Sequence, residues 1–268
     1  MGRYAFFATW MTKIIFAFCA AIVLAQPCAT AERNLVQLDE PTSAWKVTTD
    51  HLELATEIPA SASIRDILNG RYEAAFLAPD QSVPTLNGND KIVWGRLSIH
   101  HLGDRVSSFS VVAKYPHLDR IDWYVQGADG LVAHSANGQF VARTKDQIAN
   151  RFPIVTMMLA PGETKDVYFR IRSDTVIILP LRVYQTSTWV SQSTIAILLF
   201  GLLIGCLLTM AALGFVSFFG SRHWSSLWFA VFCIASAGYI LTASGIDKGY
   251  LWPNRTGDYL FMLFVFQG

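Results

Sequence analysis

The side chains best suited to binding chemistry are tyrosines and arginines in short segments where polar and apolar residues alternate. Arg170 and Arg172 lie two residues apart on one side of such a segment, and Tyr124 and Arg182 lie in two others. An aromatic ring can stack on the apolar face of a sugar, and a planar guanidinium binds hydroxyl or carboxylate groups. We predict that Tyr124, Arg170, Arg172 and Arg182 bind a small ligand; the alternative is a solvated or ion-paired surface.

Motifs for catalysis and metal binding are missing from the sequence. It contains no G-x-S-x-G, no H-E-x-x-H and no glycine-rich phosphate loop. His100 and His101 are neighbours on an expected strand, so they point to opposite faces and do not easily share an ion. Asp119 and Asp122 flank the start of another strand, where solvated acids are the simplest interpretation. We predict no catalytic residue, no metal site and no cofactor.

The composition indicates a membrane protein. Hydrophobic residues make up 52% of the 268 residues and charged residues only 15%, against about 25% charged residues in soluble domains. The net charge of +1 offers no electrostatic basis for binding nucleic acid. The lipid bilayer is therefore an expected partner, and nucleic acid is not.

The N-terminus has the three parts of a secretory signal peptide. Basic residues precede a short apolar run at 14–24, and Ala29-Thr30-Ala31 forms a small-x-small cleavage site. The run is short for a membrane span of about 20 residues. We predict a signal peptide at 1–31 and a mature start at Glu32, with a retained signal anchor as the alternative.

The C-terminal part predicts membrane-spanning helices. Residues 194–219 and 224–246 contain no charged residue, and each stretch is long enough to cross a hydrocarbon core of about 30 Å. A third apolar run, 259–268, would reach only about 15 Å as a helix. We expect a helical bundle whose third span is cut short at the end of this sequence.

Two further features concern the first span. Trp189 precedes it, where an interfacial aromatic anchor belongs. Gly201 and Gly205 have the G-x-x-x-G spacing that lets another helix approach closely. We predict that these glycines pack within the bundle or, as the alternative, in a homodimer. Export of the N-terminal part would place Arg222-His223 in the cytoplasm.

Residues 32–188 form the predicted exported domain. Apolar and polar residues alternate in several short segments, and turn signals such as Asn137-Gly138 and Pro161-Gly162 separate them. This pattern is typical of an antiparallel sandwich or barrel. One short helix is expected at 63–68, with Ser63 as its N-cap.

The order of several motifs resembles one family, the bacterial seven-transmembrane receptors with diverse intracellular signalling modules (7TMR-DISM). The motifs, over residues 38–268, are Ser63-Ile-Arg-Asp-Ile-Leu-Asn-Gly-Arg-Tyr72, Trp94-Gly-Arg96, Leu118-Asp-Arg-Ile-Asp-Trp-Tyr-Val125, Gly138 with Arg143, Arg151-Phe-Pro153, Tyr168-Phe-Arg-Ile-Arg-Ser173, Leu179-Pro-Leu-Arg182, Gly201-Leu-Leu-Ile-Gly205, Gly245 and Tyr250-Leu-Trp-Pro253.

The resemblance implies a fold and a function. The family's outer domain is a jelly-roll sandwich similar to carbohydrate-binding modules, followed by seven spans and a cytoplasmic effector such as a diguanylate cyclase or histidine kinase in the same chain. We therefore predict an all-β jelly-roll sandwich followed by a helical membrane bundle. The protein would be a receptor of the bacterial inner membrane that senses a small ligand, such as a carbohydrate, in the periplasm. The effector would follow residue 268, so this segment itself is expected not to be an enzyme. The alternative is a membrane-tethered carbohydrate-binding or adhesion module without signalling output.

Overall fold

The computed structural model describes most of the chain between residues 34 and 254. The described residues are 34–39, 42–86, 92–127, 130, 132–144, 147–174 and 176–254. The predicted signal peptide and the third apolar run lie outside them. Contacts divide the chain into units 1–34 and 35–268, and all the described strands and helices belong to the second unit.

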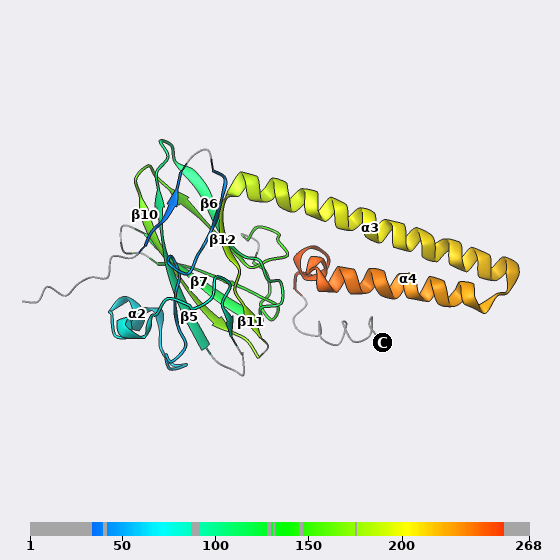
Figure 1. Cartoon of the computed structure of the whole chain (residues 1–268), viewed down its shortest axis with the longest axis horizontal. Coiled ribbons are helices and arrows are strands. Elements are labelled where there is room, and N and C mark those ends of the chain that lie inside the picture. Colours follow the sequence, from blue (N-terminus) through cyan, green and yellow to red (C-terminus); the bar gives the residue numbers. More distant parts are fainter. Residues whose placement is uncertain are drawn as a thin grey trace, which may run out of the picture. The chain divides into compact units, whose positions relative to one another are not determined.

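Two β-sheets form the N-terminal part (Figure 1). The first sheet has the order β1-β5-β10-β7-β8, and β3 also pairs with β5. The second has the order β2-β12-β6-β9, and β4 pairs with β11 in a small separate ladder. The strands are β1 (Val36–Leu38), β2 (Ala44–Lys46), β3 (Glu53–Ala55), β4 (Thr85–Leu86), β5 (Ile92–His101), β6 (Ser107–Ala113), β7 (Arg120–Gln126), β8 (Val132–Asn137), β9 (Ile154–Leu159), β10 (Thr164–Arg172), β11 (Ile177–Ile178) and β12 (Leu181–Gln185).

The main core lies between the two sheets, as the alternating pattern requires. Trp123 and Phe169 point inward from the first sheet, with their ring centroids 5.6 Å apart, and both are fully buried. Val111 and Val183 belong to the same core from the second sheet. The predicted β-sandwich is therefore confirmed. The strand order agrees with jelly-roll winding, which stays a prediction.

A smaller core covers the outer face of the first sheet. The helix α2 (Ile64–Leu68) and the 3₁₀ turn η1 (Glu73–Ala75) supply apolar residues that pack on Trp94 and Tyr168. The predicted helix and its cap are confirmed. Ser63 accepts from the Asp66 backbone N–H, and the Asp66 carboxylate accepts from the Ser63 backbone N–H at 2.9 Å, which completes a capping box.

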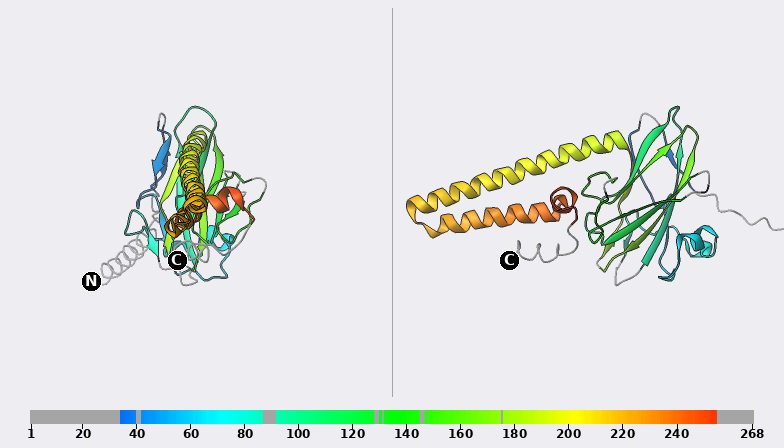
Figure 2. Two further views of the ribbon diagram at one scale, coloured as in Figure 1. Left: turned by 90° about the vertical axis from the view of Figure 1, so that its right-hand side faces the viewer. Right: turned by 180° about the vertical axis from the view of Figure 1, so that it is seen from behind.

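Two long apolar helices and a short π-helical segment follow the sandwich (Figure 2). They are α3 (Thr186–Ser221), α4 (Trp224–Ala243) and η2 (Asp247–Leu251). Both α3 and α4 are long and apolar enough to cross a membrane. Arg222, at φ 57°, is the left-handed residue that ends α3.

The limits of the helices differ from the predicted spans at both ends of α3 and at the end of α4. α3 begins at Thr186 rather than residue 194 and ends at Ser221 rather than residue 219, and no charged residue lies anywhere between Arg182 and Arg222. α4 ends at Ala243 rather than residue 246, because Gly245 adopts a φ of +73° and its N–H donates to the Thr242 carbonyl at 3.0 Å. Hydropathy continues past this point, but a left-handed glycine terminates the helix.

The predicted glycines do not mediate the contact between α3 and α4. A Cβ added at Gly201 or Gly205 meets nothing within 4 Å among the described residues. The close approach occurs at Gly214, where an added Cβ would lie 3.1 Å from the Ser226 carbonyl and 3.1 Å from Ala230 Cβ. A packing role for Gly201 and Gly205 against other helices or a second copy stays a prediction.

Candidate ligand-binding face and membrane junction

The outer face of the first sheet brings aromatic and charged side chains into neighbouring rows. Strand pairing places Tyr168 between Arg96 and Tyr124, and Tyr124 beside His134. In the next row Arg170 lies between Trp94 and Asp122, on the same strand face as Arg172. We call the group of Tyr124, Arg170, Arg172, Asp122 and His134 on this side of the sheet the aromatic–arginine face.

Stacked rings form the centre of this face. The Tyr124 ring stacks on His134, with centroids 4.9 Å apart and an interplanar angle of 26°. It stacks on Trp94 at 5.9 Å and 20°. The guanidinium of Arg170 lies over the Trp94 ring at 5.9 Å and donates to the Ala60 carbonyl at 2.9 Å. Burial raises the pKa of the Tyr124 phenol, and Asp122 raises it further, so this hydroxyl stays protonated at neutral pH.

A buried carboxylate organises the edge of the face. Asp122 is only 5% exposed; it accepts from Arg120 Nε and Nη2, both at 3.0 Å, and lies 3.2 Å from His134 Nε2. Asp119 is also buried and accepts from the Ser173 hydroxyl at 2.9 Å. The interpretation of these two residues as solvated acids was therefore wrong: local donors compensate the cost of their burial.

The structure brings together three of the four predicted ligand-binding residues. Tyr124, Arg170 and Arg172 share one face of the first sheet. Arg182 lies on β12 of the other sheet, exposed, between Lys46 and Val112. It belongs to a different surface. Ligand binding by Tyr124, Arg170 and Arg172 on this face, and by Arg182 on its own surface, stays a prediction.

Sequence reasoning missed His134 as a member of the face. The turn signal Ala128-Asp129-Gly130 separates the segments that form β7 and β8 and indicates a hairpin. That hairpin pairs Tyr124 with His134, so the turn was the usable signal.

The buried side chain of Arg96 attaches η1, which packs on the outer face of the first sheet, to strand β5. The Arg96 guanidinium donates to Glu53 through Nε, and to both carboxylate oxygens of Glu73 at 2.6 and 2.7 Å. It also lies 4.4 Å from the Phe76 ring centroid. Burial acts to lower the pKa of Arg96, but the hydrogen bonds to the two carboxylates outweigh it and the net shift is upward. This bidentate contact links η1 to β5.

The sandwich continues into the membrane helix without a linker. Gln185 is the last residue of β12 and also the N-cap of α3. The Thr186 hydroxyl lies 2.9 Å from the hydroxyls of both Ser108 and Ser110 on β6. The first turn of α3 is thereby attached to the neighbouring strand as well as to its own.

Trp189 strengthens this attachment. It is 4% exposed and packs on Tyr184, with ring centroids 4.9 Å apart, and on Phe152 at 6.0 Å. The expectation of an interfacial membrane anchor at Trp189 was wrong, because the sandwich itself buries the side chain.

The end of α4 makes a second contact with the sandwich. His117 Nε2 lies 3.1 Å from the Ala243 carbonyl, and Arg143 donates to the Gly249 carbonyl at 2.7 Å. Glycine permits this approach: a Cβ at Gly249 would lie 2.9 Å from Arg151 Cα and from the Asn150 carbonyl oxygen. The sandwich therefore contacts the membrane hairpin at both α3 and the segment after α4.

The fold and the junction define a class of protein in which a β-sandwich is joined directly to membrane helices. Comparison with family models shows the family to which the chain belongs. The family model described as 7TMR-DISM extracellular 2 matches residues 49–185, and the one described as 7TM diverse intracellular signalling matches residues 196–267. The chain belongs to the 7TMR-DISM family. It is a membrane protein of a sensory receptor family with an extracellular domain. No curated protein sequence matches the chain.

Solved structures resemble the chain only distantly. A protein titled CpGH89CBM32-6, produced by Clostridium perfringens, is 12% identical over 52% of this chain and 99% of its own, with a TM-score of 0.24. An exo-beta-1,3-galactanase from Phanerochaete chrysosporium is 12% identical over 53% of this chain and 29% of its own, at a TM-score of 0.25. A two-domain esterase active on acetylated mannans is 10% identical over 66% of this chain and 45% of its own, with a TM-score of 0.25. These scores are too low to carry an argument about fold or ligand.

Proposed function

We propose that this chain is the sensing and first membrane-spanning part of a bacterial inner-membrane receptor. Its sandwich, in the periplasm, binds a small ligand such as a carbohydrate on the aromatic–arginine face, and the membrane helices relay binding to a cytoplasmic effector. The observation that carries the proposal is the continuity of β12 and α3 at Gln185 and Thr186. A flexible tether would separate a binding domain from its membrane helix, whereas this junction links them mechanically.

The relay requires two arrangements of the sandwich that the ligand distinguishes. A ligand shifts such an equilibrium only by its difference in affinity for the two states. A displacement of β12 against β6 would move Thr186 relative to Ser108 and Ser110, and with it the first turn of α3. The contact of Arg143 with Gly249 would pass the same displacement to the segment after α4.

Lengthening the junction tests the relay. Insertion of Gly-Ser-Gly-Ser between Gln185 and Thr186 should leave ligand binding intact and abolish the ligand-dependent change in crosslinking between α3 helices, because helix and strand no longer move together. Cys206, an exposed free cysteine on α3, provides the thiol for this crosslink. The full receptor in membranes, titrated with a panel of oligosaccharides, provides the measurement.

The control carries the same four residues after Asp104, in the exposed hairpin between β5 and β6. It should bind and respond like the unmodified receptor. An insertion at residue 185 that responds fully would contradict the relay. Ligand binding without any change in crosslinking in the unmodified receptor would instead favour a tethered binding or adhesion module.

Truncation of the stacked tyrosine tests the binding face. Tyr124→Ala should weaken oligosaccharide binding by about 30-fold, since removing a central aromatic contact costs about 2 kcal/mol. Arg105→Ala, in the exposed hairpin between β5 and β6, is the control and should change the affinity less than twofold. Isothermal titration calorimetry measures both. Equal losses in the two variants would place the ligand elsewhere.

A further inference from the structure

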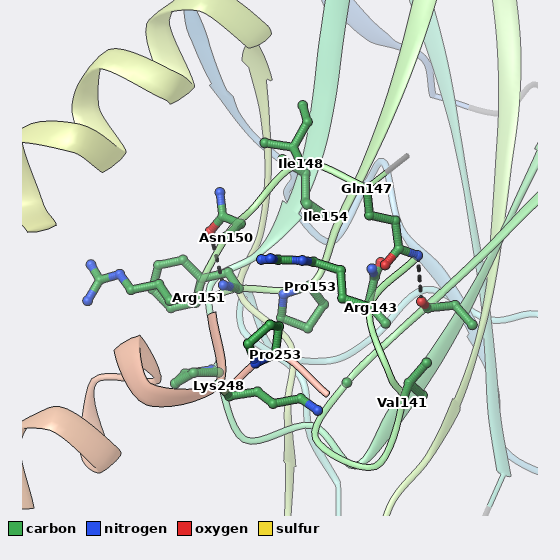
Figure 3. Close-up of a pocket in the computed structure, with 15 residues that line it drawn as sticks. Val141, Arg143, Gln147, Ile148, Asn150, Arg151, Pro153, Ile154, Lys248 and Pro253 are labelled. Carbon is green, nitrogen blue, oxygen red and sulfur yellow. Dashed lines mark hydrogen bonds between the residues drawn. The ribbon is translucent and has the colours of Figure 1, made fainter. Parts of the chain in front are cut away.

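A polar pocket lies where the sandwich meets the segment after α4 (Figure 3). We call it the junction pocket. The end of β8, the connection from β8 to β9, and η2 with the residues after it contribute to its wall. Its polar lining residues are Asn137, Arg143, Gln147, Asn150, Arg151 and Lys248.

Positive charge dominates this pocket. Arg143 extends across its centre, and Lys248, from η2, lines the opposite side, with Pro253 between the two in this view (Figure 3). Arg151 lines the wall but points away, with its guanidinium 5.1 Å from the Phe200 ring centroid on α3. No carboxylate is among the described lining residues. Asp247 acts on Lys248 from the neighbouring position but does not line the pocket.

Burial and two neighbouring charges act on the Lys248 ammonium in this pocket. Burial lowers the pKa of the Lys248 ammonium; Asp247 counteracts this, and Arg143 lowers it further. Folding therefore brings like charges together, and contacts of η2 with the sandwich hold them there. An anion between them would relieve both the repulsion and the loss of hydration.

The pocket also contains N–H groups that can donate hydrogen bonds to a bound ligand. The described contact of Arg143 to the Gly249 carbonyl uses one of the five N–H donors of a guanidinium. The Asn150 side-chain oxygen accepts from the Phe152 backbone N–H at 3.0 Å, which leaves its NH₂ group to donate elsewhere. Such a set suits an oxyanion with several acceptor oxygens.

The position of the pocket along the chain indicates the source of the anion. The 20 residues of α4 would span about 30 Å, the thickness of the hydrocarbon core. Lys248 follows the end of α4 at Ala243 within a few residues, so it would lie at the level of the phosphate groups. Basic residues at this level attract anionic lipids.

We propose that the junction pocket binds the phosphate group of an anionic phospholipid in the outer leaflet, between Arg143 and Lys248. The bound headgroup would bridge the sandwich and η2 and so strengthen their contact. This site is distinct from the aromatic–arginine face, and its occupancy does not require the sensed ligand.

Lipid retention in the full chain tests the proposal. The chain is reconstituted in nanodiscs of phosphatidylcholine with an equal share of phosphatidylglycerol, and native mass spectrometry counts the lipids retained after release. Retention of phosphatidylglycerol should exceed that of phosphatidylcholine. Lys248→Gln, which preserves the hydrogen bond from Arg143 to Gly249, should lower this preference about fivefold, and Arg143→Gln with Lys248→Gln should remove it.

A control matched in charge separates the pocket from general electrostatics. Arg65→Gln with Arg105→Gln removes two exposed positive charges from the sandwich and should leave the preference unchanged. An equal loss in this control, or no loss in the pocket variants, would overturn the proposal. A second arm adds 10 mM inorganic phosphate, which should not displace the lipid. Displacement would overturn the lipid assignment in favour of a free anion.

Discussion

Replacement of Gly95 by alanine is expected to cost at least about 3 kcal/mol of folding free energy, at the upper end of overpacking costs in a close-packed core. A Cβ at this position would overlap three atoms of the Phe169 ring. The ring has no room to move, because Phe169 is fully buried and in edge contact with Trp123. Such a loss is a large part of the roughly 5–15 kcal/mol that holds a domain folded.

A second substitution identifies the cause of this loss. Phe169→Leu in the Gly95→Ala background should recover part of the stability, although Phe169→Leu alone is destabilising, because the smaller side chain vacates the space that the new methyl needs. Thermal unfolding of the full chain in detergent, followed by near-ultraviolet circular dichroism, measures all three variants. Strictly additive losses would mean that the steric account is wrong.

Gly249→Ala is expected to separate η2 from the sandwich while the sandwich stays folded. The added methyl would meet Arg151 Cα and the Asn150 carbonyl oxygen, each at 2.9 Å. These are backbone atoms, which cannot rotate away as a side chain can. We expect a cost of about 1–3 kcal/mol at the contact, which is enough to undock a short segment.

Hydrogen exchange followed by mass spectrometry measures this undocking. Peptides that cover 149–153 and 244–251 should lose protection at least about fivefold, which corresponds to 1 kcal/mol, while peptides of β5 and β10 keep theirs. Gly201→Ala is the control: its added methyl meets nothing within 4 Å in the described chain, and alanine is the better helix former by about 1 kcal/mol. Unchanged protection in Gly249→Ala would show that the contact does not hold η2 in place.

The undocking of η2 expected in Gly249→Ala should also affect the relay of ligand binding. If the contact after α4 contributes to the relay, this variant should bind oligosaccharide normally and respond weakly in the Cys206 crosslinking measurement. The insertion after Gln185 acts on the other contact, through α3. Comparing the two variants would therefore show how the signal divides between the helices.

Features that depend on near neighbours in the chain could be predicted from the sequence. Alternation along Ile121-Asp122-Trp123-Tyr124-Val125 predicted β7 and which of its residues face the core. Ser63 and Asp66, three residues apart, define the cap of α2. Long uncharged stretches predicted α3 and α4. Side-chain periodicity and capping act over a few residues, so a single stretch of sequence contains all the information they need.

Contacts between residues far apart in the chain could not be predicted from the sequence. Strand register placed Tyr124 and Arg170 on one face and Arg182 on another sheet. Docking buried Trp189 against Tyr184, although its position before an apolar stretch favours a membrane anchor. The junction pocket joins Arg143 to Lys248, more than 100 positions apart along the chain. Such contacts depend on how whole strands and helices pair. The free energy that selects one pairing is a sum over the entire fold, so no single segment of sequence contains it.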